Sequence, residues 1–323
     1  MAPSGRGFLL RLSIVLACTG VAVFVLASLI SHPDSTHATL VPGTSCRLGP
    51  YMLALESFET ENDADGSVAD YVSRIIWHDA SGGHAATVRV GHPAVMGGWS
   101  FFQSDCGFTR EGERTSTLLC VRDVLVPVKA VGLWALLAAG LLMIAGALSD
   151  FLSGKGRHGY GRIIVPLCTV FAIVFAWMVL GSVGVGRHSL PPVLRSSWFA
   201  PHLAAYIAGY SVMATATVIG ILSIRKETLS APLRLLVRIG FGLLTCGLVL
   251  GALWASKAWG TFWAWDPKET WALATWLCYA LFLLLPEKKW RIAVLLCAFL
   301  LLQMCWWGVR LLPSASASMH LYG

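Results

Sequence analysis

Seven apolar segments set the strongest limit on what this chain can fold into. They lie at about residues 12–30, 130–148, 163–185, 202–224, 239–254, 271–285 and 292–312. An α-helix needs about 20 mostly apolar residues to cross a bilayer, and the shorter segments can extend into their tryptophan-rich flanks. Only 13% of the residues are charged, whereas a soluble domain has about 25%. We therefore predict an all-α polytopic membrane bundle of about seven transmembrane helices.

Basic residues in three loops predict the orientation of this bundle. The chain has a net charge of +7, and Lys and Arg gather at 149–162, 225–238 and 287–291. Cytoplasmic loops of membrane proteins are enriched in these residues. Seven alternating spans place these loops and the N-terminus in the cytoplasm, and residues 188–201, 254–271 and the C-terminus outside. We expect a multi-pass protein of the inner (cytoplasmic) membrane. The sequence contains no basic-aromatic motif that would indicate nucleic-acid binding.

The first apolar run is longer than a signal sequence requires. It covers 19 residues from Leu12 to Ile30, whereas the apolar part of a signal peptide has about 7–15 residues. We therefore predict an uncleaved transmembrane anchor at 1–30. In the polar stretch 31–126, β-rich sequences such as Ser-Phe-Phe-Gln alternate with Gly-Gly and Asp-Gly turns. This pattern predicts a small external β-rich domain, followed by a membrane domain at 127–323.

Three cysteines lie in the predicted β-rich domain. They are Cys46, Cys106 and Cys120, and an external location permits a disulfide. Cys106 and Cys120 are the favoured pair, which would leave Cys46 free, although the sequence alone does not fix the pairing. The other six cysteines lie in predicted spans without metal-site spacing, so we interpret them as small apolar side chains.

Residues 254–271, hereafter the Trp segment, contain the densest aromatic cluster of the chain. Its tryptophans are Trp254, Trp259, Trp263, Trp265 and Trp271, with Gly260 between them. Trp favours a membrane–water boundary, and so many on one short segment predict a flat aromatic shelf for a planar ligand. The residues Asp266, Pro267 and Glu269 suit the N-cap, N1 and N3 positions of a following helix.

Two histidines lie on the predicted external side near this shelf. His202 opens an apolar span, and His320 lies beyond the last one. Two neutral imidazoles on opposite sides of a planar macrocycle suit six-coordinate haem iron, whereas a single boundary His more often serves as an interfacial residue. His188 is a third candidate. Cations that can pair with the propionates are Arg187, Arg195 and Arg310.

Several stretches resemble the haem-handling proteins of cytochrome c biogenesis system II. The run WASKAWGTFWAWDPKETWALATW resembles the tryptophan-rich "WWD" segment of the CcsA/ResC branch. The sequences LPPVLRSSWFAPHLAAYIAGYSVM and RLLPSASASMHLYG resemble the regions of that family that contain its two external haem-ligand histidines, which fall on His202 and His320. The stretch VRVGHPAVMGGWSFFQSD is similar to the ResB (CcsB) pattern. The chain therefore resembles a compact fused CcsBA, with a ResB-like part ahead of a CcsA-like part.

The resemblance implies a cytochrome c synthetase, or haem lyase. Such a protein binds haem b as its substrate and attaches it through thioether bonds to the Cys-x-x-Cys-His motif of apocytochrome c. Implied partners are apocytochrome c, a partner that keeps its thiols reduced, and membrane lipid. The implied haem contacts are His202 and His320 as axial ligands of the iron, and Trp254, Trp259, Gly260, Trp263, Trp265, Asp266 and Trp271 around the ring. No residue is assigned as a catalytic acid, base or nucleophile.

The chain departs from this family inside the membrane. Leu284 stands where the family has another histidine after the Trp segment, and the first two spans contain none. A haem exporter or chaperone without ligase activity is therefore an alternative function. A scaffold without haem, in which the Trp segment is an interfacial aromatic belt, is a further alternative.

Overall fold

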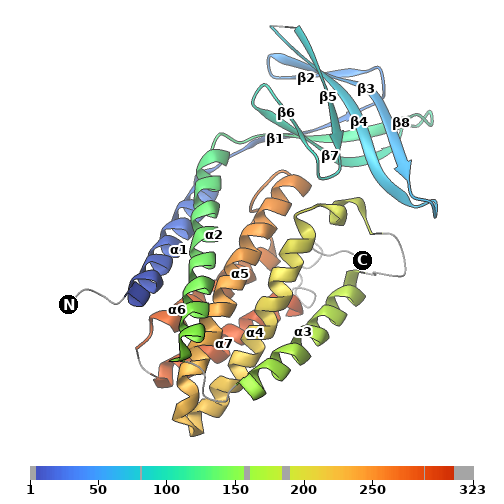
Figure 1. Cartoon of the computed structure of the whole chain (residues 1–323). Helices are drawn as coiled ribbons and strands as arrows, with labels where there is room; N and C mark the ends of the chain where they lie inside the picture. Colours follow the sequence, from blue (N-terminus) through green and yellow to red (C-terminus); the bar gives the residue numbers. More distant parts are fainter. Residues whose placement is uncertain (1–4, 81, 156–160, 184–189, 287, 309–323) are drawn as a thin grey trace.

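Seven α-helices and eight strands make up the part of the chain that the computed structural model describes, residues 5–80, 82–155, 161–183, 190–286 and 288–308. The helices form one bundle (Figure 1). In the sequence, all eight strands come between the first two helices. The helices are α1 (Gly5–Ile30), α2 (Val126–Asp150), α3 (Gly161–Val183), α4 (Phe199–Arg225), α5 (Ser230–Ala258), α6 (Pro267–Leu284) and α7 (Lys288–Trp306). Helices α1 to α5 each contain a segment long and apolar enough to cross a membrane, and α7 contains a shorter apolar segment.

The strands form two four-stranded antiparallel sheets, which together we call the β-domain. They are β1 (Asp34–Leu40), β2 (Ser45–Leu48), β3 (Tyr51–Asn62), β4 (Val68–Asp79), β5 (Gly82–Arg89), β6 (Ala94–Met96), β7 (Trp99–Phe108) and β8 (Arg114–Arg122). Sheet A has the order β1-β8-β7-β6, and sheet B the order β2-β3-β4-β5. The β-domain lies at one end of the helix bundle (Figure 1).

Alternating side chains and one β-bulge build the core between the two sheets. On β3, Leu53 and Leu55 are fully buried, and the register then shifts between Leu55 and Ser57. The bulge moves the buried position from odd to even residues, so that Phe58 also faces the core. The bulge therefore keeps Leu53, Leu55 and Phe58 on the core face while β3 stays paired with β4.

The strand register contradicts the expected Cys106–Cys120 disulfide. Cys106 on β7 lies opposite Ser116 of β8, whereas Cys120 lies opposite Phe101. Cys120 is therefore four residues along β8 from the position opposite Cys106, or about 13 Å at the usual rise of a strand. A disulfide requires Cα atoms about 4.4–6.8 Å apart, so this pairing was wrong. All nine cysteines are free thiols in the structure.

Helix α5 begins earlier than the sequence pattern predicted. The stretch 225–238 was expected to be a cytoplasmic loop because of its basic residues, but α5 starts at Ser230. The charge of Arg238 is accommodated on the helix because its guanidinium donates a hydrogen bond of 2.5 Å to Asp150 at the end of α2. Residues 230–238 therefore form the first turns of α5, and only residues 226–229 connect α4 to α5.

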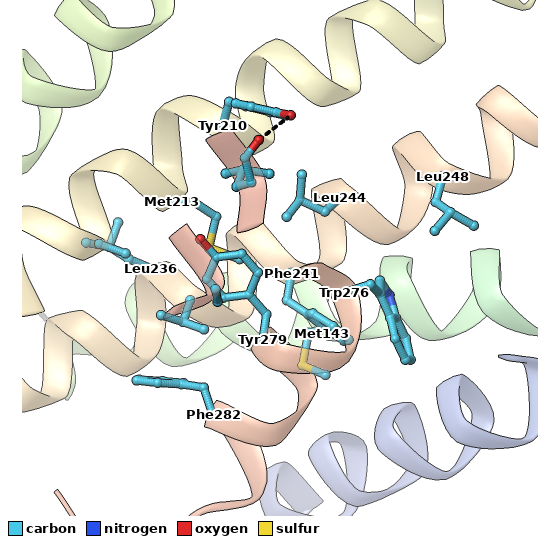
Figure 2. Packing of buried hydrophobic residues seen from close by; sticks show 14 of the residues in the cluster. Met143, Tyr210, Met213, Leu236, Phe241, Leu244, Leu248, Trp276, Tyr279 and Phe282 are labelled. Carbon is cyan, nitrogen blue, oxygen red and sulfur yellow. Dashed lines mark hydrogen bonds between the residues drawn. The ribbon is translucent and has the colours of Figure 1, made fainter. Parts of the chain in front are cut away.

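Large buried side chains fill the core of the bundle, and Figure 2 shows part of this cluster. Met143 of α2, Tyr210 of α4, Phe241 of α5 and Tyr279 of α6 are all buried in this cluster. Tyr210 donates a hydrogen bond of 3.2 Å from its hydroxyl to the carbonyl of Leu302 on α7. This packing holds α2, α4, α5 and α6 in fixed relative positions.

A buried ion pair connects the β-domain to the helix bundle. Asp123 follows β8, and its carboxylate accepts hydrogen bonds from Lys129 Nζ at 2.6 Å and from the Ser31 hydroxyl at 2.8 Å. The side chains of Lys129 and Asp123 are only 7% and 10% exposed. Ser31 directly follows α1, and Lys129 lies in the first turn of α2. One carboxylate therefore joins both chain connections between the bundle and the β-domain.

We predict that Asp123→Ala destabilises the protein by about 3 kcal/mol, because removing one partner of a buried pair leaves the other charge unpaired. Thermal unfolding in mild detergent, followed by tryptophan fluorescence, measures the change in midpoint. Glu111→Ala, in an exposed turn, is the control. The double variant Asp123→Leu/Lys129→Leu should regain most of the lost stability. An unchanged midpoint in Asp123→Ala would show that the pair has no structural role.

Candidate functional site

His202 lies in the first turn of α4, at the end of the bundle that faces the β-domain. It is the only histidine in the described part of any helix. Its Nδ1 donates a hydrogen bond of 2.9 Å to the backbone carbonyl of Gly247 on α5. A carbonyl can only accept, so this contact fixes the tautomer that has its lone pair on Nε2. Metal-binding histidines are commonly oriented by such a bond from their other ring nitrogen.

Two glycines of α5 make room for the aromatic side chains at the start of α4. A Cβ atom at Gly251 would lie 2.6 Å from Cε1 and 2.8 Å from Nδ1 of His202. A Cβ atom at Gly247 would lie 3.1 Å from the ring of Tyr206. The spacing Gly-x-x-x-Gly places both glycines on one face of α5. The two helices can therefore pack closely enough for His202 to reach the Gly247 carbonyl.

Aromatic rings surround the imidazole of His202 on several sides. The indole of Trp254 stacks on it at 6.1 Å and 22°, and Tyr206 meets it edge-on at 4.9 Å. Trp254 is only 1% exposed, and its Nε1 donates a hydrogen bond of 3.1 Å to the carbonyl of Val193. Phe199 packs against Trp254 at 5.1 Å. These contacts restrict rotation of the imidazole.

The other tryptophans of the Trp segment do not form the flat shelf that was predicted. Trp259 meets Trp254 at 74°, and Trp263 meets Trp265 at 85°. Both pairs are edge-to-face contacts, which aromatic quadrupoles favour over a face-to-face arrangement. Trp263 also meets Phe24 of α1 edge-on at 5.9 Å. The segment is thus a folded aromatic cluster that contacts both α5 and α1.

Trp265 has an unusual backbone conformation within this cluster. Its φ of 58° makes it the one non-glycine residue with positive φ in the described chain. Its side chain is the most exposed of the cluster, at 40%. A bulky residue in the left-handed region is strained, and such strain concentrates at functional sites. Trp265 therefore presents an indole outward from a backbone that the neighbouring contacts hold in place.

The predicted helix start after the cluster is confirmed in detail. Asp266 is the N-cap of α6, and its Oδ1 accepts a hydrogen bond of 2.8 Å from the amide of Lys268. Glu269 Oε2 accepts from the amides of Ala264 at 2.8 Å and Asp266 at 3.2 Å. Both carboxylates are buried. They form a complete capping box, which fixes the backbone of the Trp segment relative to α6.

The β-domain covers the Trp segment at Gly260. A Cβ atom at this glycine, whose φ is 82°, would lie 3.0 Å from Phe102 and 3.2 Å from Val121. These two residues alternate with the core-facing Phe101 and Cys120 on β7 and β8. Phe102 and Val121 are each only 5% exposed. The outer face of sheet A therefore packs directly on the Trp segment.

An ion pair forms a second contact between the β-domain and the site. Arg195, in a short 3-10 helix at Pro192–Arg195, lies 2.5 Å from the Asp63 carboxylate. The hydrogen bond from Arg195 holds the pKa of Asp63 below its usual range. Arg195 was one of the cations expected to pair with haem propionates, and in the structure its guanidinium binds the β-domain.

The remaining predicted residues divide into two groups. Trp271 lies in the second turn of α6, where its carbonyl accepts a hydrogen bond of 2.8 Å from Thr275. Leu284, at the end of α6, is exposed. The residues that lie outside the described part of the chain are Arg187, His188, Arg310 and His320.

Sequence patterns missed several contributors to this site. The paired spacing of Gly247 and Gly251 was the available signal for the close contact of α5 with α4. Lys268 was not among the predicted site residues, but its Nζ lies 5.9 Å from the centroid of the Trp306 ring. In the described part of the chain, the Nε1 of Trp263 and the hydroxyl of Thr261 are buried without a hydrogen-bond partner. Such groups can donate to a bound ligand.

Two family models match consecutive parts of the chain. The model described as "Cytochrome C assembly protein" matches residues 128–315. The model described as "ResB-like family" matches residues 13–152, so the two overlap in α2. The first of these covers more than half of the chain, including His202 and the whole Trp segment.

Curated relatives agree with the first model. The chain is 32% identical over 183 residues to the cytochrome c biogenesis protein CcsA of Chlamydomonas reinhardtii, which covers 50% of this chain and 51% of that protein. It is 31% identical over 202 residues to the CcsA of Guillardia theta, covering 50% of this chain and 66% of that protein. The chain thus spans about half to two thirds of the length of these relatives.

A shorter match is closer in sequence. The CcsA of Adiantum capillus-veneris is 44% identical over 92 residues, which cover 27% of this chain and 28% of that protein. With a ResB-like part ahead of a cytochrome c assembly part, the chain belongs to the cytochrome c assembly protein family as a fused, CcsBA-type member of cytochrome c biogenesis system II.

Proposed function

We propose that this protein binds haem b at the Trp segment and attaches it to the Cys-x-x-Cys-His motif of an apocytochrome c. The observation that carries the proposal is the hydrogen bond between His202 and the Gly247 carbonyl. It orients the imidazole and selects the tautomer that an iron ligand needs. His320, which lies outside the described residues, is the second axial ligand in this proposal.

The aromatic cluster has two separate roles in this proposal. An axial imidazole stands upright on the haem plane, and Trp254 is nearly parallel to the imidazole. Trp254 therefore supports the ligand rather than lying flat beneath the macrocycle. Trp259, Trp263, Trp265 and Trp271 remain the candidates for contact with the ring itself, beside Gly260. The buried donors of Trp263 and Thr261 fit a bound polar ligand group.

Asp266 serves this site through the backbone. Its carboxylate is buried and caps α6, so it holds the Trp segment in position. The haem propionates require cations, and Arg195 is paired with Asp63. Lys268, in the first turn of α6, supplies a further positive charge beside the cluster. Arg187 and Arg310 stay candidates from the sequence.

Attachment requires positioning rather than a catalytic nucleophile. Each cysteine thiol of the motif adds across one vinyl group of haem, so that sulfur bonds to the carbon next to the ring. The thiol proton is transferred to the terminal carbon, and no group leaves. Holding a thiol and a vinyl group in a reactive orientation can supply several kcal/mol of the barrier, on the order of 7 or more in favourable cases. The thiols of the apocytochrome must be reduced before they can add, and we assign this reduction to a separate partner protein.

The bundle also suggests where the reaction takes place. The Trp segment, His202 and the β-domain lie at the same end of the bundle. We assign this end to the external face of the membrane, because the basic loops 149–162, 225–238 and 287–291 are predicted to be cytoplasmic. Lipid would then contact the exposed apolar faces of the helices. The apocytochrome approaches from the side of the β-domain.

His202→Ala is predicted to reduce covalent haem attachment to a few per cent of the wild-type level, because the oriented imidazole is lost. A host without its own cytochrome c maturation system expresses the chain with a reporter apocytochrome, and haem staining of a denaturing gel measures the product. His37→Ala, on the exposed face of β1, is the control. Wild-type output from His202→Ala would contradict the proposal. Haem that co-purifies with the wild-type chain without any covalent product would favour a chaperone.

Gly251→Ala tests the position of the ligand while leaving His202 in the sequence. The new Cβ would lie 2.6 Å from Cε1 of the imidazole, whose movement away is restricted by the rings of Tyr206 and Trp254. We expect a loss of attachment close to that of His202→Ala. Gly146→Ala is the matched control, because its Cβ would meet the flexible end of Arg238 at 3.1 Å and make an ordinary contact with Leu9 at 3.9 Å. Equal activity of Gly251→Ala and Gly146→Ala would show that close packing at Gly251 is unimportant.

A further inference from the structure

We propose that Cys46 and Cys120 form a disulfide that joins the two sheets of the β-domain. The proposal rests on the external placement of this domain argued above, because an oxidising compartment is required. It replaces the pairing of Cys106 with Cys120, which the strand register excludes. Three features of the β-domain support it.

The two thiols face the same core from opposite sheets. On β2, Cys46 points inward with Leu48, whereas Ser45 and Arg47 are exposed. Its strand partner is Leu53, which is fully buried. Cys120 on β8 is also fully buried, opposite Phe101. Both cysteines belong to the single apolar cluster between the sheets.

The chain crosses from one sheet to the other directly before Cys46. The chain passes from β1 in sheet A to β2 in sheet B through the short connection 41–44, and β1 is paired with β8. Pairs of Cα atoms from β3 and β8 lie within 8 Å of each other, as do pairs from β1 and β2. Stacked sheets are usually about 10 Å apart. The thiols of Cys46 and Cys120 are close enough to interact electrostatically, as the partners of a prospective disulfide must be.

The electrostatic environment identifies Cys46 as the neighbour of Cys120. Burial, together with a smaller contribution from the neighbouring Cys46, raises the pKa of Cys120 to about 12. Burial also raises the pKa of Cys46, which is the more accessible of the two. Cys106 instead lies beside Tyr71, whose pKa is raised by burial and by its hydrogen bond with the Cys106 thiol. Cys106 is therefore the natural control.

Formation of the bond needs an oxidant, which we assign to the class of disulfide-bearing thiol oxidoreductases. The Cys46 thiolate attacks the disulfide of the oxidant to give a mixed disulfide and release one thiol. The Cys120 thiolate then attacks the Cys46 sulfur and releases the second thiol. The protein loses two protons and two electrons, and the oxidant disulfide gains both. Once formed, the buried bond is shielded from the reductant that serves the apocytochrome.

The position of the bond connects it to the candidate site. Val121 follows Cys120 on β8 and packs against Gly260 of the Trp segment. The disulfide would therefore fasten β2 to the strand whose outer face contacts this segment. A consequence is that reduction should loosen the β-domain at its contact with the Trp segment.

Mass spectrometry of the full chain tests the pairing. The protein is isolated from bacterial membranes without reductant, its free thiols are alkylated in denaturant, and the digested peptides are analysed. We expect a peptide linking Cys46 to Cys120 that is lost on reduction, with Cys106 alkylated. The link should persist in Cys106→Ser and be absent from Cys46→Ser. A linked peptide that contains Cys106 would overturn the proposal.

Treatment with oxidised glutathione distinguishes two reasons why the disulfide could be absent, a reducing environment and an unsuitable geometry of the two cysteines. If Cys46 and Cys120 are thiols as isolated but become linked after treatment, the geometry is correct and the oxidising placement is wrong. Alkylation of both residues before and after treatment overturns the geometry. Haem attachment by the same preparation is measured in parallel. A preparation that attaches haem but lacks the disulfide contradicts only the disulfide proposal and leaves the haem proposal intact.

Discussion

The hydrogen bond from His202 to the carbonyl of Gly247 depends on how closely α4 and α5 pack, and much of the site depends on this bond. The helices can approach because Gly247 and Gly251 leave space for Tyr206 and His202. Trp254, one turn further along α5 from Gly251, then reaches the imidazole and stacks on it. A side chain at either glycine would separate the helices and move the imidazole. The orientation of a single nitrogen is thus determined by helix packing.

The β-domain extends this arrangement beyond the bundle. Trp254 donates to Val193, and Arg195 in the same 3-10 helix binds Asp63. A continuous series of contacts therefore runs from sheet B to the residue that supports His202. Sheet A contributes separately, since Phe102 and Val121 rest on Gly260. The β-domain contacts the membrane part on both sides of the candidate site and can influence it without supplying a ligand.

Features governed by local patterns were predictable from the sequence. The apolar runs corresponded to the helices, and Asp266 with Glu269 formed the expected capping box. The β-rich character of the stretch between the first two helices was also correct. These features follow from interactions between residues close in sequence, such as capping bonds and alternating burial.

Features that depend on distant residues were not predictable. The start of α5 was misplaced because the partner of Arg238 is Asp150, 88 residues away. The flat shelf failed because spacing does not specify whether neighbouring indoles stack or meet edge-on. The cysteine pairing depended on the register between strands, which the cysteine positions do not encode. The proposed role of His202 as a ligand rests on the family resemblance and on its orienting hydrogen bond.

The most direct test of the central claim is the visible spectrum of the purified chain from haem-replete cells, in oxidised and reduced states. The account predicts a bis-histidine haem spectrum in the wild type. It also predicts that this spectrum is absent from His202→Ala/His320→Ala, while the variant protein keeps its helical content. A wild-type chain without haem, or a double variant with an unchanged bis-histidine spectrum, would contradict the assignment of haem to this site.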